Sequence, residues 1–121
     1  MAKKLRKLLH APSKAVTAER AVRLHRILTL LGGGPHTRSA LMRRLGLDDR
    51  GFYRDLELLR KSGINLPFVN RRYALQSDLA AAIARLPFPN PHLTLGDAIR
   101  LAKGGSLAHR KLKYQIASIV S

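Results

Sequence analysis

The stretch "TRSALMRRLGLDDRGFYRDLELLRKSGI", residues 37–64, decides the fold of this chain. Thr37 is a suitable cap for a short helix, "RSALMRRL", which ends at Gly46. A further helix then spans about residues 49–62. Two helices joined by three or four residues that include a glycine form the helix-turn-helix arrangement. We therefore expect the two helices of this stretch to pack as such a unit.

A longer helix precedes this unit. Thr17 is a good N-cap for it, and "LGGGP" at residues 31–35 ends it, since a glycine supplies a left-handed C-cap and proline cannot continue the helix. An apolar stripe at helical spacing runs between these ends: Leu24, Ile27, Leu28 and Leu31. The glycine run is not read as a phosphate-binding loop, because no Lys-Ser/Thr follows it and it follows a helix.

From Ile64 the sequence alternates between apolar and other residues, which predicts a short β-hairpin. Ile64, Leu66 and Phe68 are its apolar positions on one side, and Pro67 restricts that strand to an edge because proline cannot donate to a ladder. The segment "NRR", residues 70–72, forms the turn of the hairpin.

Three short helices are expected in the remainder of the chain. Ser77 and Asp78 begin the first, and Thr94 with Asp97 begins the second in the manner of a capping box. The last helix has about fourteen residues, with one apolar stripe: Leu112, Ile116, Ile119 and Val120. The predicted fold class is mainly α with a small β-hairpin and a C-terminal helical extension.

The composition restricts the partners of the protein. With 121 residues the chain fits one domain, and 23 Lys and Arg against 7 Asp and Glu give a formal net charge of +16. Such a charge concentrates polyanions, so nucleic acid is the expected partner, with a solubilising surface or attraction to anionic membrane as alternatives. No stretch approaches the roughly 18 apolar residues of a membrane span.

The absence of cysteine removes disulfides, thiolate zinc sites and cysteine nucleophiles. It is compatible with a reducing cytosol, and we expect a cytoplasmic location. Residues 1–16 are interpreted as a basic flexible arm, with an organellar transit peptide as the alternative, because their apolar part is too short for a secretory signal.

The sequence around the two central helices carries a family resemblance. "RLHRILTLL", the stretch of residues 37–64 and "RRYAL" together resemble the winged helix-turn-helix DNA-binding domain of DeoR-like and WYL-type bacterial transcription regulators, over roughly residues 20–76. In that family the pattern runs as Leu-Gly-Val-Ser, Arg-Thr-Ile, Arg-Asp-Leu and Leu-Arg-x-x-Gly-Ile. The matching positions keep the register without a gap: Leu45, Gly46, Leu47 and Asp48; Arg50, Gly51 and Phe52; Arg54, Asp55 and Leu56; Leu59, Arg60, Gly63 and Ile64.

Three departures from the family pattern affect the DNA contacts. The usual serine is Asp48, the usual threonine is Gly51, and the wing turn lacks the common glycines. Gly51 removes a hydroxyl group and lowers helix propensity by about 1 kcal/mol relative to alanine. The contact set of the family is therefore not simply inherited.

The resemblance implies a sequence-specific regulator that binds double-stranded DNA as a homodimer, without a cofactor. Residues 17–76 would form the winged helix-turn-helix domain, and residues 77–121 a helical extension for dimerisation or packing. Residues 93–120 are more loosely similar to the segment that follows this domain in WYL-type regulators. A sensor domain is missing from the sequence, so the chain is expected to be either a short stand-alone regulator or a fragment.

A helical wheel divides the helix at 49–62 into two faces. The core face has Phe52, Leu56 and Leu59, and the opposite face has the candidate reading residues with Glu57 beside them: Arg50, Tyr53, Arg54 and Lys61. Arginine reads guanine O6 and N7 in the major groove, and tyrosine reaches a phosphate or a thymine methyl. The alternative is that these side chains only solvate an exposed face.

Other basic residues are candidates for contacts to the DNA backbone. Arg71 and Arg72 at the hairpin turn are expected on backbone phosphate or in the minor groove. Arg38, Arg43 and Arg44 on the short helix are expected to make non-specific phosphate contacts, as are the lysines and arginine of the arm. Solubility alone would also explain arginines in an exposed turn.

The acids of the reading helix have local explanations. Asp48 and Asp49 lie at its start, where they cap free N–H groups and meet the positive end of the dipole. Glu57 is placed to pair with Lys61 one turn later. We expect Asp55, beside the core face, to pair with an arginine of a neighbouring helix and to orient the reading helix.

Catalysis and metal binding are not expected. The five histidines are scattered, and the serines and acids form no nucleophile-base pattern. Two other functions stay open at this point: a non-specific nucleic-acid-binding or RNA-associated basic protein, and a winged-helix module for protein interaction.

Overall fold

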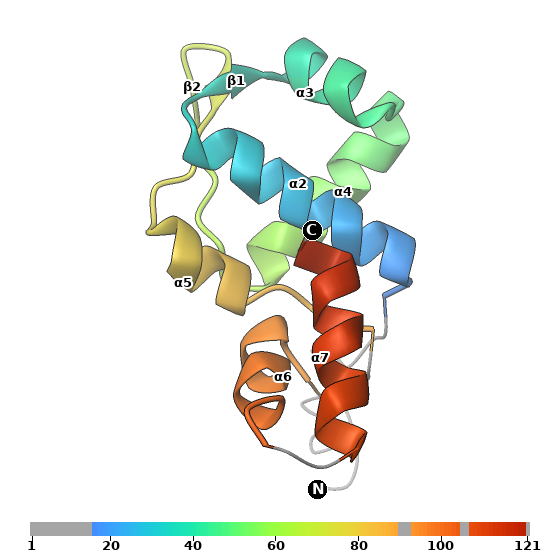
Figure 1. The fold of residues 1–121 in the computed structure, drawn as a ribbon. Helices are drawn as coiled ribbons and strands as arrows, with labels where there is room; N and C mark the ends of the chain where they lie inside the picture. Colours follow the sequence, from blue (N-terminus) through green and yellow to red (C-terminus); the bar gives the residue numbers. More distant parts are fainter. Residues whose placement is uncertain (1–15, 90–92, 105–106, 121) are drawn as a thin grey trace, which may run out of the picture.

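The computed structural model of the chain describes residues 16–89, 93–104 and 107–120. In these ranges six helices accompany a three-stranded antiparallel sheet (Figure 1). The fold is thus mainly helical with a small hairpin, as the sequence predicts. No helix in the described ranges has both the length and the apolar character needed to cross a bilayer.

Helix α2, Ala18–Gly32, runs across the middle of the molecule (Figure 1). Its predicted cap is confirmed, because the Thr17 side chain accepts a hydrogen bond from the backbone N–H of Arg20 at 3.1 Å. All four residues of the predicted stripe are buried. The helix ends in the glycine run as expected, but the predicted left-handed C-cap is wrong. Gly33 is right-handed with φ −84°, and its N–H bonds to the Leu30 carbonyl in a tightened last turn.

Helices α3, Arg38–Leu45, and α4, Asp49–Lys61, agree with the predicted pair. The Thr37 side chain caps α3, and Gly46 ends it in the left-handed conformation with φ 65°. Asp48 caps α4, where its carboxylate accepts a hydrogen bond from the backbone N–H of Gly51 at 2.8 Å. Three residues therefore connect the two helices.

The sheet has the order β1-β3-β2, with β1 at His36–Thr37, β2 at Phe68–Val69 and β3 at Arg72–Tyr73. The predicted hairpin is present as β2 and β3, and β2 is an edge strand as Pro67 indicates. Strand β1 was not expected. It pairs with β3 and thereby fastens the hairpin to the residues that lead into α3.

The side chains of the hairpin depart from the predicted pattern at one position. Ile64 and Leu66 are buried, but Phe68, the third apolar position of the alternation, is 52% exposed. Its cross-strand partner Tyr73 fills the space against α4 instead, with its ring centroid 5.4 Å from that of Phe52. Phe68 on the edge strand lies over Tyr73 and remains half in solvent.

The turn between β2 and β3 has two central residues with positive φ, Asn70 at 53° and Arg71 at 63°. This backbone geometry is that of a type I′ turn, whose twist matches the twist of a hairpin. Asparagine is a common choice at such a position, whereas arginine is not. Arg71 is exposed at the tip of the hairpin.

The C-terminal part contains α5 at Leu79–Ala84, α6 at Leu95–Leu101 and α7 at Leu107–Val120. The predicted capping box of Thr94 and Asp97 is formed by reciprocal hydrogen bonds of 3.1 Å. Helix α7 lies beside α6 and packs its C-terminal end against α2 (Figure 1), and all these helices contribute to one hydrophobic cluster.

Two residues near the chain ends correct the sequence interpretation. Val120 is 39% exposed and does not join the predicted stripe, because it follows the buried Ile119 by one residue and so points about 100° away. Val16, assigned to the flexible arm, is buried in the hydrophobic cluster. The rest of the predicted arm, residues 1–15, lies outside the described residues.

Candidate nucleic-acid interface

Helix α4 divides into an inner and an outer face as the helical wheel predicts. Phe52, Leu56 and Leu59 are buried against the core. Every predicted residue of the outer face is exposed: Arg50, Tyr53, Arg54, Glu57 and Lys61. The core therefore holds one side of α4 and leaves the other side to solvent.

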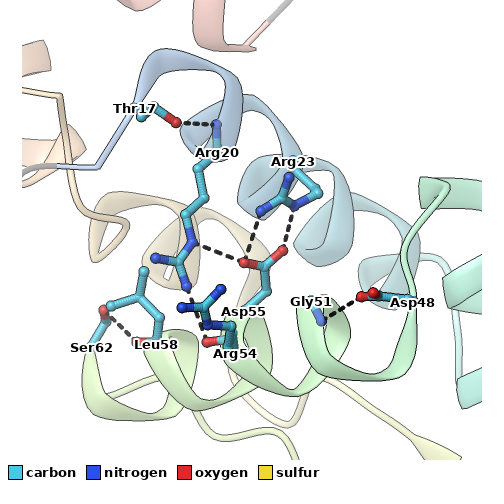
Figure 2. A network of polar contacts seen from close by, with 9 residues as sticks. All are labelled: Thr17, Arg20, Arg23, Asp48, Gly51, Arg54, Asp55, Leu58 and Ser62. Atoms are coloured by element: carbon cyan, nitrogen blue, oxygen red, sulfur yellow. Dashed lines mark hydrogen bonds and ion pairs between the residues drawn. The ribbon is translucent and has the colours of Figure 1, made fainter.

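A buried acid fixes α4 against α2. Asp55 is fully buried, and it accepts a hydrogen bond from Arg20 Nε at 2.9 Å and two from Arg23, one of them from Nη2 at 3.1 Å (Figure 2). The expected pairing of Asp55 with an arginine of a neighbouring helix is confirmed, with two arginines in place of one. The hydrogen bond with Asp55 raises the pKa of Arg23, although burial acts in the opposite direction.

The same cluster also holds the backbone of α4. Arg20 Nη2 donates to the backbone carbonyl of Arg54 at 3.2 Å (Figure 2). Arg20 and Arg23 stay 32% and 31% exposed, so only the carboxylate is removed from water, and three charge-assisted hydrogen bonds offset that cost. This arrangement sets the rotation of α4 about its own axis.

The start of α4 explains the unusual Gly51. A Cβ atom added there would lie 3.0 Å from Asp48 Oδ1 and 3.2 Å from Leu47 Cδ2. Glycine therefore leaves room for the capping carboxylate, which bonds to the N–H of this same residue (Figure 2). The two departures from the family pattern, Asp48 and Gly51, fit each other in space.

Arg38 connects α3 to the outer face of α4. Its Nη1 donates a hydrogen bond to Tyr53 Oη at 3.1 Å and lies 3.6 Å from Asp49 Oδ1. The hydrogen bond with Tyr53 is the largest cause that raises the pKa of Arg38. Arg38 is thus a positioned cation beside α4.

Lys61 and Glu57 form the predicted ion pair at 3.0 Å on the exposed side of α4. Both side chains are largely in solvent, where such a pair contributes little to stability. The charge of Lys61 is partly neutralised by this contact, which makes it a weaker candidate for DNA contact than the arginines.

The other six candidate arginines differ from Arg38 because no carboxylate of the described residues lies within ion-pair distance of them. Within the described ranges, none of the following guanidinium groups forms an ion pair, and all are exposed: Arg43, Arg44, Arg50, Arg54, Arg71 and Arg72. In contrast, Arg20 and Arg23 are engaged by Asp55. The structure thus separates arginines that hold the fold from arginines that are available to a polyanion.

An open groove of about 530 Å³ lies between α3, α4 and the hairpin. It brings together three candidate residues that are distant in sequence, Arg38, Tyr53 and Arg71. Its other lining residues are Thr37, Ser39, Phe68 and Tyr73. Arg50 and Arg54 are exposed on α4 but do not line this groove.

Two other candidates lie apart from the groove. Arg44 borders a different depression of about 360 Å³, together with Arg26 and Thr29 of α2. Arg72 precedes the buried Tyr73 in β3, so its side chain is on the opposite face of the sheet. The predicted set is therefore one continuous surface only in part.

Two residues of this region were missed in the sequence. The sequence pattern identifies Phe68 only as an apolar position of the hairpin, and Arg60 only as a match to the family pattern. Arg60 Nη2 donates to the Leu66 carbonyl at 2.7 Å, and its guanidinium group lies 5.9 Å from the ring centre of Tyr73. It thus ties the end of α4 to the hairpin. An aromatic residue two positions before an arginine-rich turn was the available signal for Phe68.

The described residues contain no group of three or more His, Cys, Asp or Glu side chains that could hold a metal ion. The region is characterised instead by arginines, exposed aromatic rings and a helix with a fixed orientation. Comparison of the chain with known proteins gives no match, neither to a protein family, nor to a curated protein, nor to a solved structure.

Proposed function

We propose that the protein is a sequence-specific transcription regulator that binds double-stranded DNA through a winged helix-turn-helix. Helix α4 would enter the major groove, and the hairpin of β2 and β3 would contact the backbone or the minor groove as the wing. The observation that carries the proposal is the outer face of α4, where Arg50 and Arg54 are exposed without an ion pair in the described ranges while Asp55 fixes the inner side.

The arrangement of the elements supports this proposal. Helices α3 and α4 are joined by three residues that include a left-handed glycine, as in helix-turn-helix units. The pairing of β1 with β3 holds the hairpin beside the start of α3. In this way the candidate wing and the candidate reading helix belong to one unit.

The basic residues would have different tasks in the complex. Arg50, Tyr53 and Arg54 would face base edges, where a bidentate arginine discriminates guanine by about 1–3 kcal/mol. The remaining candidates would contact phosphates, which gives affinity without sequence information. These are Arg38, Arg43, Arg44, Lys61, Arg71 and Arg72.

A homodimer through the C-terminal helices is part of the proposal. The dimer would use three large apolar side chains of α6 and α7 that are exposed: Ile99, Leu101 and Val120. A two-fold dimer would place two copies of α4 about 34 Å apart, one turn of DNA, and would match a pseudo-palindromic site. The cytoplasmic location stays a prediction.

Selection of bound DNA from a random pool tests the proposal. We expect an enriched pseudo-palindromic sequence and a specificity ratio of about 10³ or more in a salt titration against scrambled DNA. A non-specific or RNA-associated protein would instead show one common affinity for all sequences that falls steeply with salt. That result would overturn the proposal.

Variants of single arginines locate the interface. Arg54→Ala should weaken binding to the selected site by about 5- to 150-fold and relax the base preference at one position. Arg110→Ala removes the same charge from an exposed site on α7, outside the proposed interface, and is the matched control. Equal effects of the two substitutions would argue that only net charge matters. If the chain is instead a module for protein interaction, Arg54→Ala should leave its binding to the partner protein unchanged.

A further inference from the structure

The groove between α3, α4 and the hairpin has an unusual aromatic lining. Tyr53 is 46% exposed and Phe68 is 52% exposed, and both line the groove with Tyr73 beside them. The ring centres of Phe68 and Tyr73 are 4.5 Å apart at an interplanar angle of 34°. Tyr73 is buried and contacts the Phe68 ring, while about half of the Phe68 surface stays exposed.

Single exposed apolar side chains are common and need no explanation. Tyr114 is such a case, since it is 81% exposed on α7 and lines none of the described grooves. Tyr53 and Phe68 differ because they come from distant parts of the sequence and meet in one groove of about 530 Å³. This volume lies within the range of about 300–1,000 Å³ that small-ligand sites occupy.

Positive charge accompanies the aromatic rings. Arg71 reaches the groove from the turn, and its guanidinium group forms no ion pair within the described ranges. Arg38 lies on the other side, held by its hydrogen bond to Tyr53. No carboxylate is among the lining residues, although Asp49 lies 3.6 Å from Arg38.

Flat aromatic surfaces together with arginines match a ligand that is flat, aromatic and anionic. A nucleotide has these properties, since its base stacks on aromatic side chains and its phosphate accepts charge-assisted hydrogen bonds from arginine. In a fully paired duplex the base faces are covered by their neighbours, so only an unpaired and unstacked base presents them to the groove.

We propose that this groove binds one unpaired nucleobase of DNA, with the base against Phe68 and the adjoining phosphate between Arg38 and Arg71. The inference rests on the proposed function only in that the partner is DNA. The protein then binds a duplex with a single unpaired base more tightly than the same duplex without it. Its preference for such a defect adds to any sequence preference of α4.

The test uses two fluorescent duplexes of one random sequence, fully paired or with one unpaired 2-aminopurine. The full chain should bind the second duplex about 5- to 150-fold more tightly, and the 2-aminopurine fluorescence should fall as the base stacks. Phe68→Leu keeps an apolar side chain but removes the aromatic face, so it should lose this preference without weaker binding to the paired duplex. Phe68→Tyr should keep the preference.

Tyr114→Ala is the matched control, because it removes an exposed tyrosine outside the groove and should leave both affinities unchanged. Equal affinity of the full chain for the two duplexes would overturn the proposal, as would an equal loss for both duplexes in Phe68→Leu. Failure of the proposed function looks different. In that case random-pool selection gives no enriched sequence, while the preference for the unpaired base persists.

Discussion

Replacement of Asp55 by alanine tests whether the buried acid holds α4 in place. The substitution removes three hydrogen bonds from guanidinium groups, each of which contributes about 1.5–3 kcal/mol. Two effects reduce the sum. Arg20 and Arg23 are about a third exposed and can turn to water, and the cost of burying the carboxylate disappears. We expect a net loss of about 2–3 kcal/mol in the free energy of unfolding.

The loss is measured by urea denaturation followed by circular dichroism. Glu57→Ala is the control on the same helix, because it removes an acid from an exposed ion pair and should cost no more than about 0.5 kcal/mol. A double-mutant cycle with Asp55→Ala should give a larger coupling energy for Arg23, which donates two hydrogen bonds, than for Arg20, which donates one to the carboxylate.

Asp55 does not hold α4 in place if Asp55→Ala and Glu57→Ala have the same small effect, or if neither arginine is coupled to Asp55. A domain of this size has a stability of about 5–15 kcal/mol, so the variant should remain folded. Its DNA affinity can therefore be measured as well. We expect weaker binding of the selected site, since α4 is then free to rotate against α2.

Three further predictions concern the caps and the C-terminal surface. The pKa of Asp97 is lowered, first by the backbone N–H of Thr94, so its stabilising contribution is complete above the ordinary value of 3.8 and is lost as the pH falls through the lower folded value. Asp97→Ala should therefore destabilise the protein in urea denaturation at pH 7, and its difference from the parent chain should shrink as the pH falls below 3.8. Gly51→Ala should raise the free energy of unfolding by less than the ~1 kcal/mol expected from helix propensity, because the added methyl group crowds Asp48. When Asp48→Gly is also present, Gly51→Ala should give the full gain in stability. A full gain in the single variant would show that Asp48 is not crowded. Ile99→Asp should convert a dimer to a monomer in sedimentation analysis, and a monomeric parent chain at micromolar concentration would remove the dimer from the proposal.

The helices could be predicted from the sequence because their signals are local. Thr17, Thr37 and Asp48 cap helices at the expected residues, and the capping box at Thr94 is formed as expected. Apolar residues at helical spacing identified the buried faces of α2 and α4. Caps and spacing depend on neighbours within about one turn, which is the range that a sequence pattern describes.

The contacts between distant segments could not be predicted in the same way. Strand β1 has only two residues, too few for any periodicity, and it exists because β3 pairs with it. The exposure of Phe68 depends on Tyr73 occupying the space against α4. Such outcomes are decided by packing across the fold and not by local propensity.

The sequence predicts which residues of the candidate interface are exposed, but not how they are arranged in space. The outer face of α4 follows from the helical wheel, and every residue assigned to it is exposed. The groove that joins Arg38, Tyr53 and Arg71 was not foreseen, because it depends on how the hairpin lies beside α3 and α4. Likewise, the sequence suggested an arginine partner for Asp55, but only the fold selects Arg20 and Arg23.

The hydrogen bonds that hold α4 against α2 do not involve the side chains of Arg50 and Arg54. Asp55 points inward, and Arg20 bonds to the backbone carbonyl at residue 54, which any amino acid provides. Substitutions of Arg50 and Arg54 by other good helix formers therefore leave these contacts in place. Under the proposed function, libraries of helix-forming residues at these two positions would supply new target sequences, by evolution or by design, while the stability of the parent chain is retained.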